Sequence, residues 1–259
     1  MSMLDRIKKR QWDGLKDFVE SIEVTGASQR QMILMNGILE DPLFMRWVTK
    51  NVRTFNDFLQ LSSDEIDTVV RTNEAMLGVI AKALPLKDGD DIQSFAAIFP
   101  RVFGKLKDEV SYLKDVSNAE RESAQYFVLR TVRKLQKEEH IAGFQWHLPP
   151  QDVFFEKTSV KEGNISITFE DGTVAAEGEV LKGKRIGIWR HYYDNGRLLA
   201  EGNYQEGIKT GPWTFYFGSG EKRSEGRYLN DLKHGTWKEW DREGNAKNSE
   251  WLEGKKTGG

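Results

Sequence analysis

The sequence predicts an α+β protein with two domains, an all-α domain at residues 1–142 and a single-layer antiparallel β-meander at residues 152–259. Two observations predict this division. A pattern with a period of 24 residues fills the C-terminal third, and apolar residues at helical spacing fill most of the first 142 residues. Between them, residues 143–151 contain a glycine and two prolines, which favour a linker. A chain of 259 residues is long enough for two such domains.

Tryptophan and glycine define the 24-residue repeat. Trp189, Trp213 and Trp237 follow one another at this interval, and a glycine stands two residues before each of them. Glu-Gly pairs recur at 177–178, 201–202 and 225–226, and a further glycine recurs at 172, 196, 220 and 244. A fixed period indicates an array of small units that stack on their neighbours. We therefore expect the array to present a recognition surface and not a catalytic pocket.

One repeat has the pattern of a β-hairpin. Residues 187–193 are rich in the aromatic and β-branched residues that favour a strand. Gly196 then stands where a three-residue turn needs a positive φ. In the returning strand, Gly202 replaces the large residue expected there, and an aromatic side chain of the neighbouring strand can lie over it. One period earlier, residues 165–169 form a degenerate copy that we expect to cap the array.

Alternation along the strands assigns the aromatic residues to two faces. Trp189 and its two equivalents share one face, where we expect packing within the sheet rather than contact with a ligand. Tyr192 and its equivalents Tyr216 and Trp240 lie on the other face. Aromatic side chains are favoured anchors in interfaces, so these three residues are the candidates for partner binding in the sheet.

The repeats resemble MORN-type repeats, in the variant common in bacterial proteins. The fullest copy is residues 202–213, GNYQEGIKTGPW, and the resemblance covers about residues 164–259. Asp231 departs from the pattern, because the other copies have a glycine there, and the last copy is one residue short. The resemblance implies a sheet that docks a second protein or the inner membrane surface.

The N-terminal domain reads as helices throughout. Two segments near its start have apolar residues at helical spacing, Trp12, Leu15, Phe18, Val19 and Ile22 in one and Met32, Leu34, Met35, Ile38 and Leu39 in the next. Ser62 with Glu65, and Ser117 with Glu120, have the spacing of a capping box and predict two further helix starts. We expect the helix that begins after Ser117 to run to about His140.

Several stretches of this domain resemble the end of the flagellar motor switch protein FliG. They are residues 55–58 (FNDF), 101–103 (RVF), 106–112 (LKDEVSY), 122–125 (ESAQ) and 133–135 (RKL). Their order and spacing follow the family from about Gly14 to Ile141. The resemblance implies an armadillo-like, FliG C-terminal-like helical domain, the rotor domain that faces the stator protein MotA.

In the FliG family, charged residues on one helix interact with charges of the stator, and Arg101, Asp108 and Glu109 match three such positions. A spacing of seven residues would place Arg101 and Asp108 on one helical face. The alternative is an ordinary solvated helix face, in which Lys105 pairs with Glu109 four residues later.

Other family positions differ in this chain. Ser117 replaces a charged arginine, and Lys82 is at best a displaced substitute for a second charge. Residues 52–55, VRTF, replace the flexible hinge that reads Met-Phe-x-Phe in the family. The resemblance to FliG therefore does not extend to these two charges or to the hinge.

Composition and charge argue against several classes of function. The formal net charge of −2 gives no electrostatic reason to expect nucleic acid as a partner. The chain contains no cysteine, which agrees with a reducing compartment, and it shows no apolar run long enough to span a membrane. Its four histidines lack the spacing of metal ligands. We expect no catalytic site, no cofactor site and no metal site.

Together these patterns predict a non-enzymatic, cytoplasmic bacterial protein associated with a motility motor. The expected partner is a protein, a flagellar stator or rotor component, with the inner face of the cell membrane as a further docking surface for the repeats. The alternative is a cytoplasmic scaffold or antitoxin-like protein binder unrelated to motility.

Overall fold

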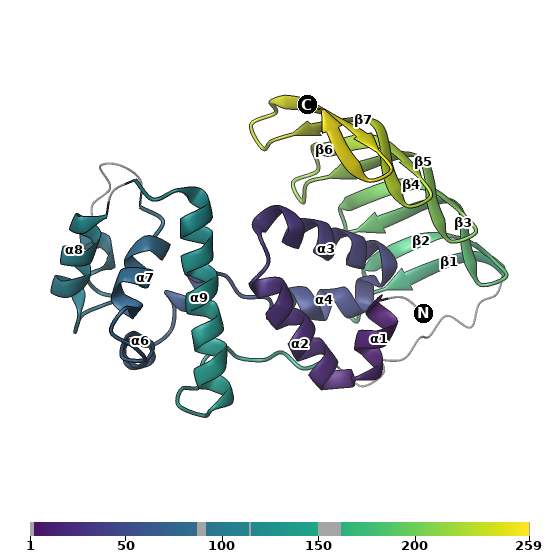
Figure 1. Cartoon of the computed structure of the whole chain (residues 1–259). Helices are drawn as coiled ribbons and strands as arrows, with labels where there is room; N and C mark the ends of the chain where they lie inside the picture. The colour runs from purple at the N-terminus through teal and green to yellow at the C-terminus, as the bar shows by residue number, and fades with distance from the viewer. Residues whose placement is uncertain (1–2, 87–91, 114, 150–161, 259) are drawn as a thin grey trace. The chain divides into compact units, whose positions relative to one another are not determined.

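The chain folds into two compact units, residues Met1–Phe154 and Phe155–Gly259 (Figure 1). A computed structural model describes residues 3–86, 92–113, 115–149 and 162–258. The first unit is helical, and the second is an antiparallel sheet. The predicted α+β layout is therefore confirmed.

The helical unit contains α1 (Met3–Lys9), α2 (Gln11–Glu23), α3 (Ala27–Glu40), α4 (Pro42–Asn51), α5 (Phe55–Phe58), α6 (Ser63–Val70), α7 (Met76–Ala83), the 3-10 helix η1 (Ile92–Phe95), α8 (Phe103–Tyr112) and α9 (Asn118–Lys137). The capping boxes at Ser62 and Ser117 start α6 and α9 as predicted. The last helix ends at Lys137, three residues before the predicted His140.

Two separate cores hold this unit together. The helices α1–α4, which we call the N-lobe, bury Leu15, Phe18, Ile22, Phe44 and Val48 among others. The helices α5–α9, the C-lobe, bury a larger set that includes Phe58, Met76, Leu106, Val128 and Val132. Helix α9 packs against α5, α6 and α7 of its own lobe and against α2 of the other, and Figure 1 shows it between the two groups.

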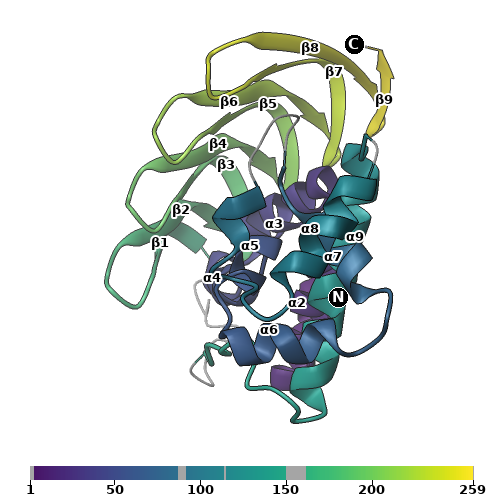
Figure 2. The same cartoon turned by 90° about the vertical axis from the view of Figure 1, so that its left-hand side faces the viewer.

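The sheet is a meander in which each strand pairs with the strand next to it in the chain. Its strands are β1 (Glu162–Thr168), β2 (Val174–Leu181), β3 (Lys184–Tyr192), β4 (Leu198–Gln205), β5 (Ile208–Tyr216), β6 (Lys222–Leu229), β7 (Leu232–Trp240), β8 (Ala246–Leu252) and β9 (Lys255–Gly258). Figure 2 shows them following one another from β1 to β9 as a single layer. The predicted degenerate copy at 165–169 corresponds to β1 and the residue that follows it.

Two kinds of turn alternate along the meander. Gly172, Gly196, Gly220 and Gly244 have positive φ in the longer turns, as the three-residue pattern predicts. The shorter turns contain two residues that both have positive φ, the geometry of a type I′ turn. Asp231 adopts this geometry, with φ 66°, in place of glycine. Its carboxylate accepts a hydrogen bond from the Lys209 N–H at 2.8 Å, which helps to hold the turn.

Residues 143–149 differ from the linker expected at 143–151. Phe144 is 4% exposed within the C-lobe core, and Trp146 packs against the N-lobe core. These two aromatic side chains bury more apolar surface than a solvated linker would allow, so the segment folds back on the helices. Residues 150 and 151, and the first ten residues of the predicted sheet domain, lie outside the described residues.

Candidate functional site

Helix α8 carries the charges that the FliG resemblance singles out. Leu106 is fully buried and attaches the helix to the C-lobe core. Asp108 and Glu109 are exposed, and within the described residues neither carboxylate has an ion-pair partner. A Cβ added at Gly78 of α7 would lie 3.2 Å from Glu109 Oε2, so the absence of a side chain at Gly78 leaves room for this carboxylate. The two acids are exposed neighbours on α8, which also exposes Lys105 and Lys107.

Arg101 does not lie on the same helical face as Asp108, and that part of the prediction is wrong. It lies in a turn, because α8 begins only at Phe103. Its guanidinium forms ion pairs with Asp64 of α6, at 2.6 Å, and with Asp67, at 3.4 Å. The hydrogen bond and charge of Asp64 raise the pKa of Arg101. Arg101 therefore anchors the turn before α8 to α6.

A shallow hollow of about 440 Å³ lies between α7 and the start of α9. Val79, Ala119, Ala124 and Phe127 contribute apolar surface, and Lys82 lies on the rim with Glu120 and Ser123. Phe127 is 47% exposed. Lys82, which lies at a shifted position relative to a charged residue of FliG, thus borders an apolar hollow.

In the sheet, the tryptophans of the repeat are packing residues, as predicted. Trp189, Trp213 and Trp237 are each at most 1% exposed. Each ring lies over the glycine of the preceding strand, and a Cβ added at Gly202 would lie 2.1 Å from the Trp213 ring. Each indole N–H also donates to a backbone carbonyl of that strand, at 3.0–3.2 Å. The glycine and the tryptophan are one structural unit, repeated three times.

A basic residue accompanies each tryptophan unit at the same 24-residue interval. The Arg185 guanidinium lies 4.4 Å from the centre of the Trp189 ring, and the Lys233 Nζ lies 4.2 Å from that of Trp237. Lys209, the equivalent in the middle repeat, lies 4.8 Å from the Tyr228 ring. Burial lowers the pKa of Lys233, although Glu239 opposes this effect. These cations take part in the packing of the aromatic face.

The other face of the sheet carries the three aromatic residues predicted to bind a partner. The Tyr192 hydroxyl donates to Glu177 at 2.6 Å, and the Tyr216 hydroxyl donates to Glu201 at 3.2 Å. Burial, followed by the hydrogen bond to Glu177, raises the pKa of Tyr192 to about 12. Trp240 has no such hydroxyl, and Lys238 lies 4.9 Å from its ring centre. All three residues are half-buried.

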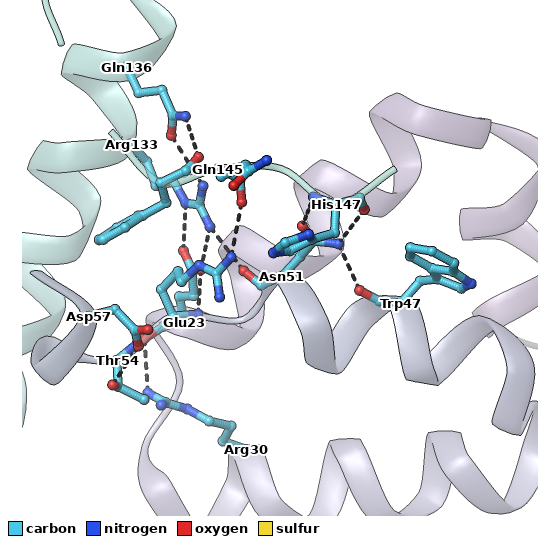
Figure 3. A network of polar contacts seen from close by, with 12 residues as sticks. Glu23, Arg30, Trp47, Asn51, Thr54, Asp57, Arg133, Gln136, Gln145 and His147 are labelled. Carbon is cyan, nitrogen blue, oxygen red and sulfur yellow. Dashed lines mark hydrogen bonds and ion pairs between the residues drawn. The ribbon is translucent and has the colours of Figure 1, made fainter. Parts of the chain in front are cut away.

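A second polar cluster lies between the two lobes of the helical unit, and the sequence reasoning missed it (Figure 3). Arg133 of α9 and Glu23 of α2 form a two-pronged ion pair, with distances of 2.7 and 3.0 Å and side chains only 5% and 2% exposed. Glu23 also accepts the Arg53 N–H at 2.8 Å, and Arg133 donates to the Asn51 carbonyl at 3.1 Å. One signal was available, because Glu23 follows Val19 by four residues on the apolar stripe of α2.

Comparison with known families confirms both resemblances. Residues 39–142 match the family model of the FliG C-terminal domain, and residues 185–206 match that of the MORN repeat variant. The first match begins at the end of α3 and includes α4 and the whole C-lobe, so it is shorter than the predicted span from Gly14. The second covers β3 and β4, one copy of the repeat. No curated protein matches the chain.

Among the described residues, no helix combines the length and the apolar character that crossing a bilayer requires. The same residues contain no cluster of three or more histidine or acidic side chains arranged to hold a metal ion.

Proposed function

We propose that this protein is a non-enzymatic interaction protein of a bacterial flagellar motor, and that its C-lobe contacts a rotor or stator component. The observation that carries the proposal is the position of Asp108 and Glu109. They lie on an exposed helix of the segment that matches the FliG C-terminal domain. A basic patch on the partner would complement them, and such charges affect the rate and specificity of binding.

Arg101 takes a supporting part in this proposal. Its ion pairs with Asp64 and Asp67 hold the turn that leads into α8, so it orients the helix that presents the two acids. The hollow beside Lys82 would receive an apolar side chain of the same partner, because Phe127 leaves apolar surface exposed there.

The sheet is the second docking surface in this proposal. Tyr192, Tyr216 and Trp240 recur once per repeat on one face and leave part of each ring open, so an elongated partner would contact successive repeats. The inner face of the cell membrane is the other surface that the repeats would meet. This assignment places the protein in the cytoplasm, at or near the membrane that holds the motor, without a cofactor.

A pull-down from the native host, scored for flagellar motor proteins, tests the proposal. The test variant is Asp108→Lys with Glu109→Lys. The matched control is Glu138→Lys with Glu139→Lys, which changes the net charge equally at an exposed site just after α9. We expect the test variant to lose capture of motor proteins and the control to keep it. If both variants capture the same motor proteins as the wild type, the charged helix is not the contact. If the wild type captures no motor protein, the scaffold or antitoxin-like alternative is favoured.

A further inference from the structure

The short segment after α9 joins the two lobes of the helical unit. We call residues 142–147 the strap. Its side chains insert into both cores in turn, since Phe144 belongs to the C-lobe core and Trp146 packs against the N-lobe core. The Arg133 guanidinium lies near both rings, 5.0 Å from the centre of Phe144 and 4.2 Å from that of Trp146.

The strap backbone is held at both of its ends. At the C-lobe end, the Gly143 N–H donates to Glu65 of α6 at 2.8 Å. The Gln136 amide of α9 donates to the carbonyls of Ala142 and Phe144 at 2.9 and 2.6 Å.

At the N-lobe end, the Asn51 side chain forms two bonds to His147. It accepts the His147 N–H at 2.7 Å and donates to the His147 carbonyl at 2.8 Å (Figure 3). Between the two ends, the Arg53 guanidinium donates to the Gln145 carbonyl at 3.0 Å.

Arg53 belongs to the only direct covalent connection between α4 and α5, residues 52–54. This connection is itself bonded to α2 and to α5. The Arg53 N–H is bonded to Glu23, and Thr54 forms a capping box with Asp57 at the start of α5. Rotation of one lobe against the other at residues 52–54 would therefore break the Glu23 and Gln145 contacts together.

We propose that the strap is a lock that holds the N-lobe and the C-lobe as one rigid body. Opening the lock withdraws Trp146 from the N-lobe and separates Glu23 from Arg133, which would leave a buried carboxylate without its counter-charge. Reorientation of the lobes thus requires release of the strap and not merely rotation about residues 52–54. The strap also explains why Gly143 is needed, since its φ is 64° and a Cβ there would lie 3.0 Å from Gln136.

Distance measurements between spin labels on the two lobes test the lock. The chain contains no cysteine, so Ser28→Cys on α3 and Lys107→Cys on α8 provide two exposed and unique labelling sites. In the full-length protein we expect one narrow distance distribution, with an open form below about 10%. Trp146→Ala should raise the open fraction at least about tenfold. Gln145→Ala is the matched control, because it keeps the backbone carbonyl bonded to Arg53 and removes only an exposed side chain.

Circular dichroism of each labelled variant establishes that the helices are intact. If Trp146→Ala loses helix, Asn51→Ala replaces it, since this change removes both bonds to His147 and leaves the aromatic residues in place. Either folded variant should broaden the distribution relative to Gln145→Ala. A wild-type distribution that is already broad, or a folded variant that stays as narrow as the control, would overturn the lock.

Discussion

The sheet and the helical unit are stabilised by contacts of very different range along the chain. In the sheet, each tryptophan lies over a glycine of the preceding strand and bonds to a carbonyl ten residues earlier. In the helical unit, Arg133 pairs with Glu23 across 110 residues, and Asn51 holds His147 across 96. The sheet therefore depends on contacts between neighbouring strands, whereas a single change at the lobe junction affects two cores that are distant in the sequence.

The largest effect is expected at the centre of the sheet. Trp213→Ala removes the ring that covers Gly202 and lies 5.2 and 5.8 Å from the Tyr204 and Tyr228 rings. Trp213→Ala should lower the free energy of unfolding by about 3–5 kcal/mol and should melt the whole sheet. Tyr216→Ala, on the other face, should cost about 1 kcal/mol. Urea unfolding, monitored by near-UV circular dichroism, measures the stability loss of each variant. A larger loss for Tyr216→Ala than for Trp213→Ala would mean that the packing face is the tyrosine face.

The next largest effect is expected at the lobe junction. Arg133→Met leaves the Glu23 carboxylate buried and unpaired, which should destabilise the helical unit by about 3 kcal/mol. The double variant with Glu23→Leu should recover most of this loss, because an apolar pair needs no counter-charge. Lys134→Met, an exposed neighbour on α9, is the control and should change stability by less than about 0.5 kcal/mol. Additive losses in the double variant would show that the two side chains do not act as a pair.

An acid-dependent effect is expected at His191. This residue is fully buried among Trp189, Tyr204 and Trp213, and neither ring nitrogen has a partner within the described residues. Burial, and then the charges of Arg185 and Lys209, lowers its pKa well below 6.5. The neutral form is therefore the folded form, while the unfolded chain takes up a proton below about pH 6.5.

The contribution of His191 to the free energy of unfolding of the sheet should consequently be constant above about pH 6.5. Below this pH it should fall with acidification, by up to about 1.4 kcal/mol per pH unit. His191→Phe, which copies Phe215 of the next repeat, should remove this dependence and add about 1 kcal/mol at neutral pH. Thermal unfolding between pH 5 and 8 measures both effects, and parallel pH profiles for the two proteins would contradict the assignment.

The smallest effect is expected at Asp231. This residue occupies a turn position with φ 66°, so Asp231→Ala should cost about 1 kcal/mol through backbone strain and loss of the bond to Lys209. Asp231→Gly loses the same bond but relieves the strain, and should lie within about 0.5 kcal/mol of the wild type. Equal losses in the two variants, measured by thermal unfolding, would assign the whole effect to the hydrogen bond.

The range of the contacts also explains what the sequence could predict. The faces of the sheet followed from Trp189 and Gly202 because neighbouring strands repeat the same contacts at a fixed interval. The pairing of Glu23 with Arg133 could not be predicted, because no local pattern relates residues 110 positions apart. Gly143 and Pro149 are local turn signals, so the sequence around the strap resembles a linker. Such signals carry no information about the two cores that Phe144 and Trp146 contact. The spacing of Arg101 from Asp108 fits a helix, although Arg101 lies in the turn before α8.

The proposed contact between α8 and a flagellar motor component is the central claim, and photo-crosslinking in the native host tests it most directly. Tyr112 ends α8 and is 82% exposed, so a benzoylphenylalanine can replace it without disturbing the core. Met32 of α3, which is 52% exposed, provides the control position. We expect the probe at Tyr112 to crosslink to a rotor or stator protein. This product should disappear when Asp108 and Glu109 are changed to lysine. The probe at Met32 should give no such product. Crosslinks from Tyr112 only to proteins unrelated to the motor, unchanged by the charge reversal, would contradict the account.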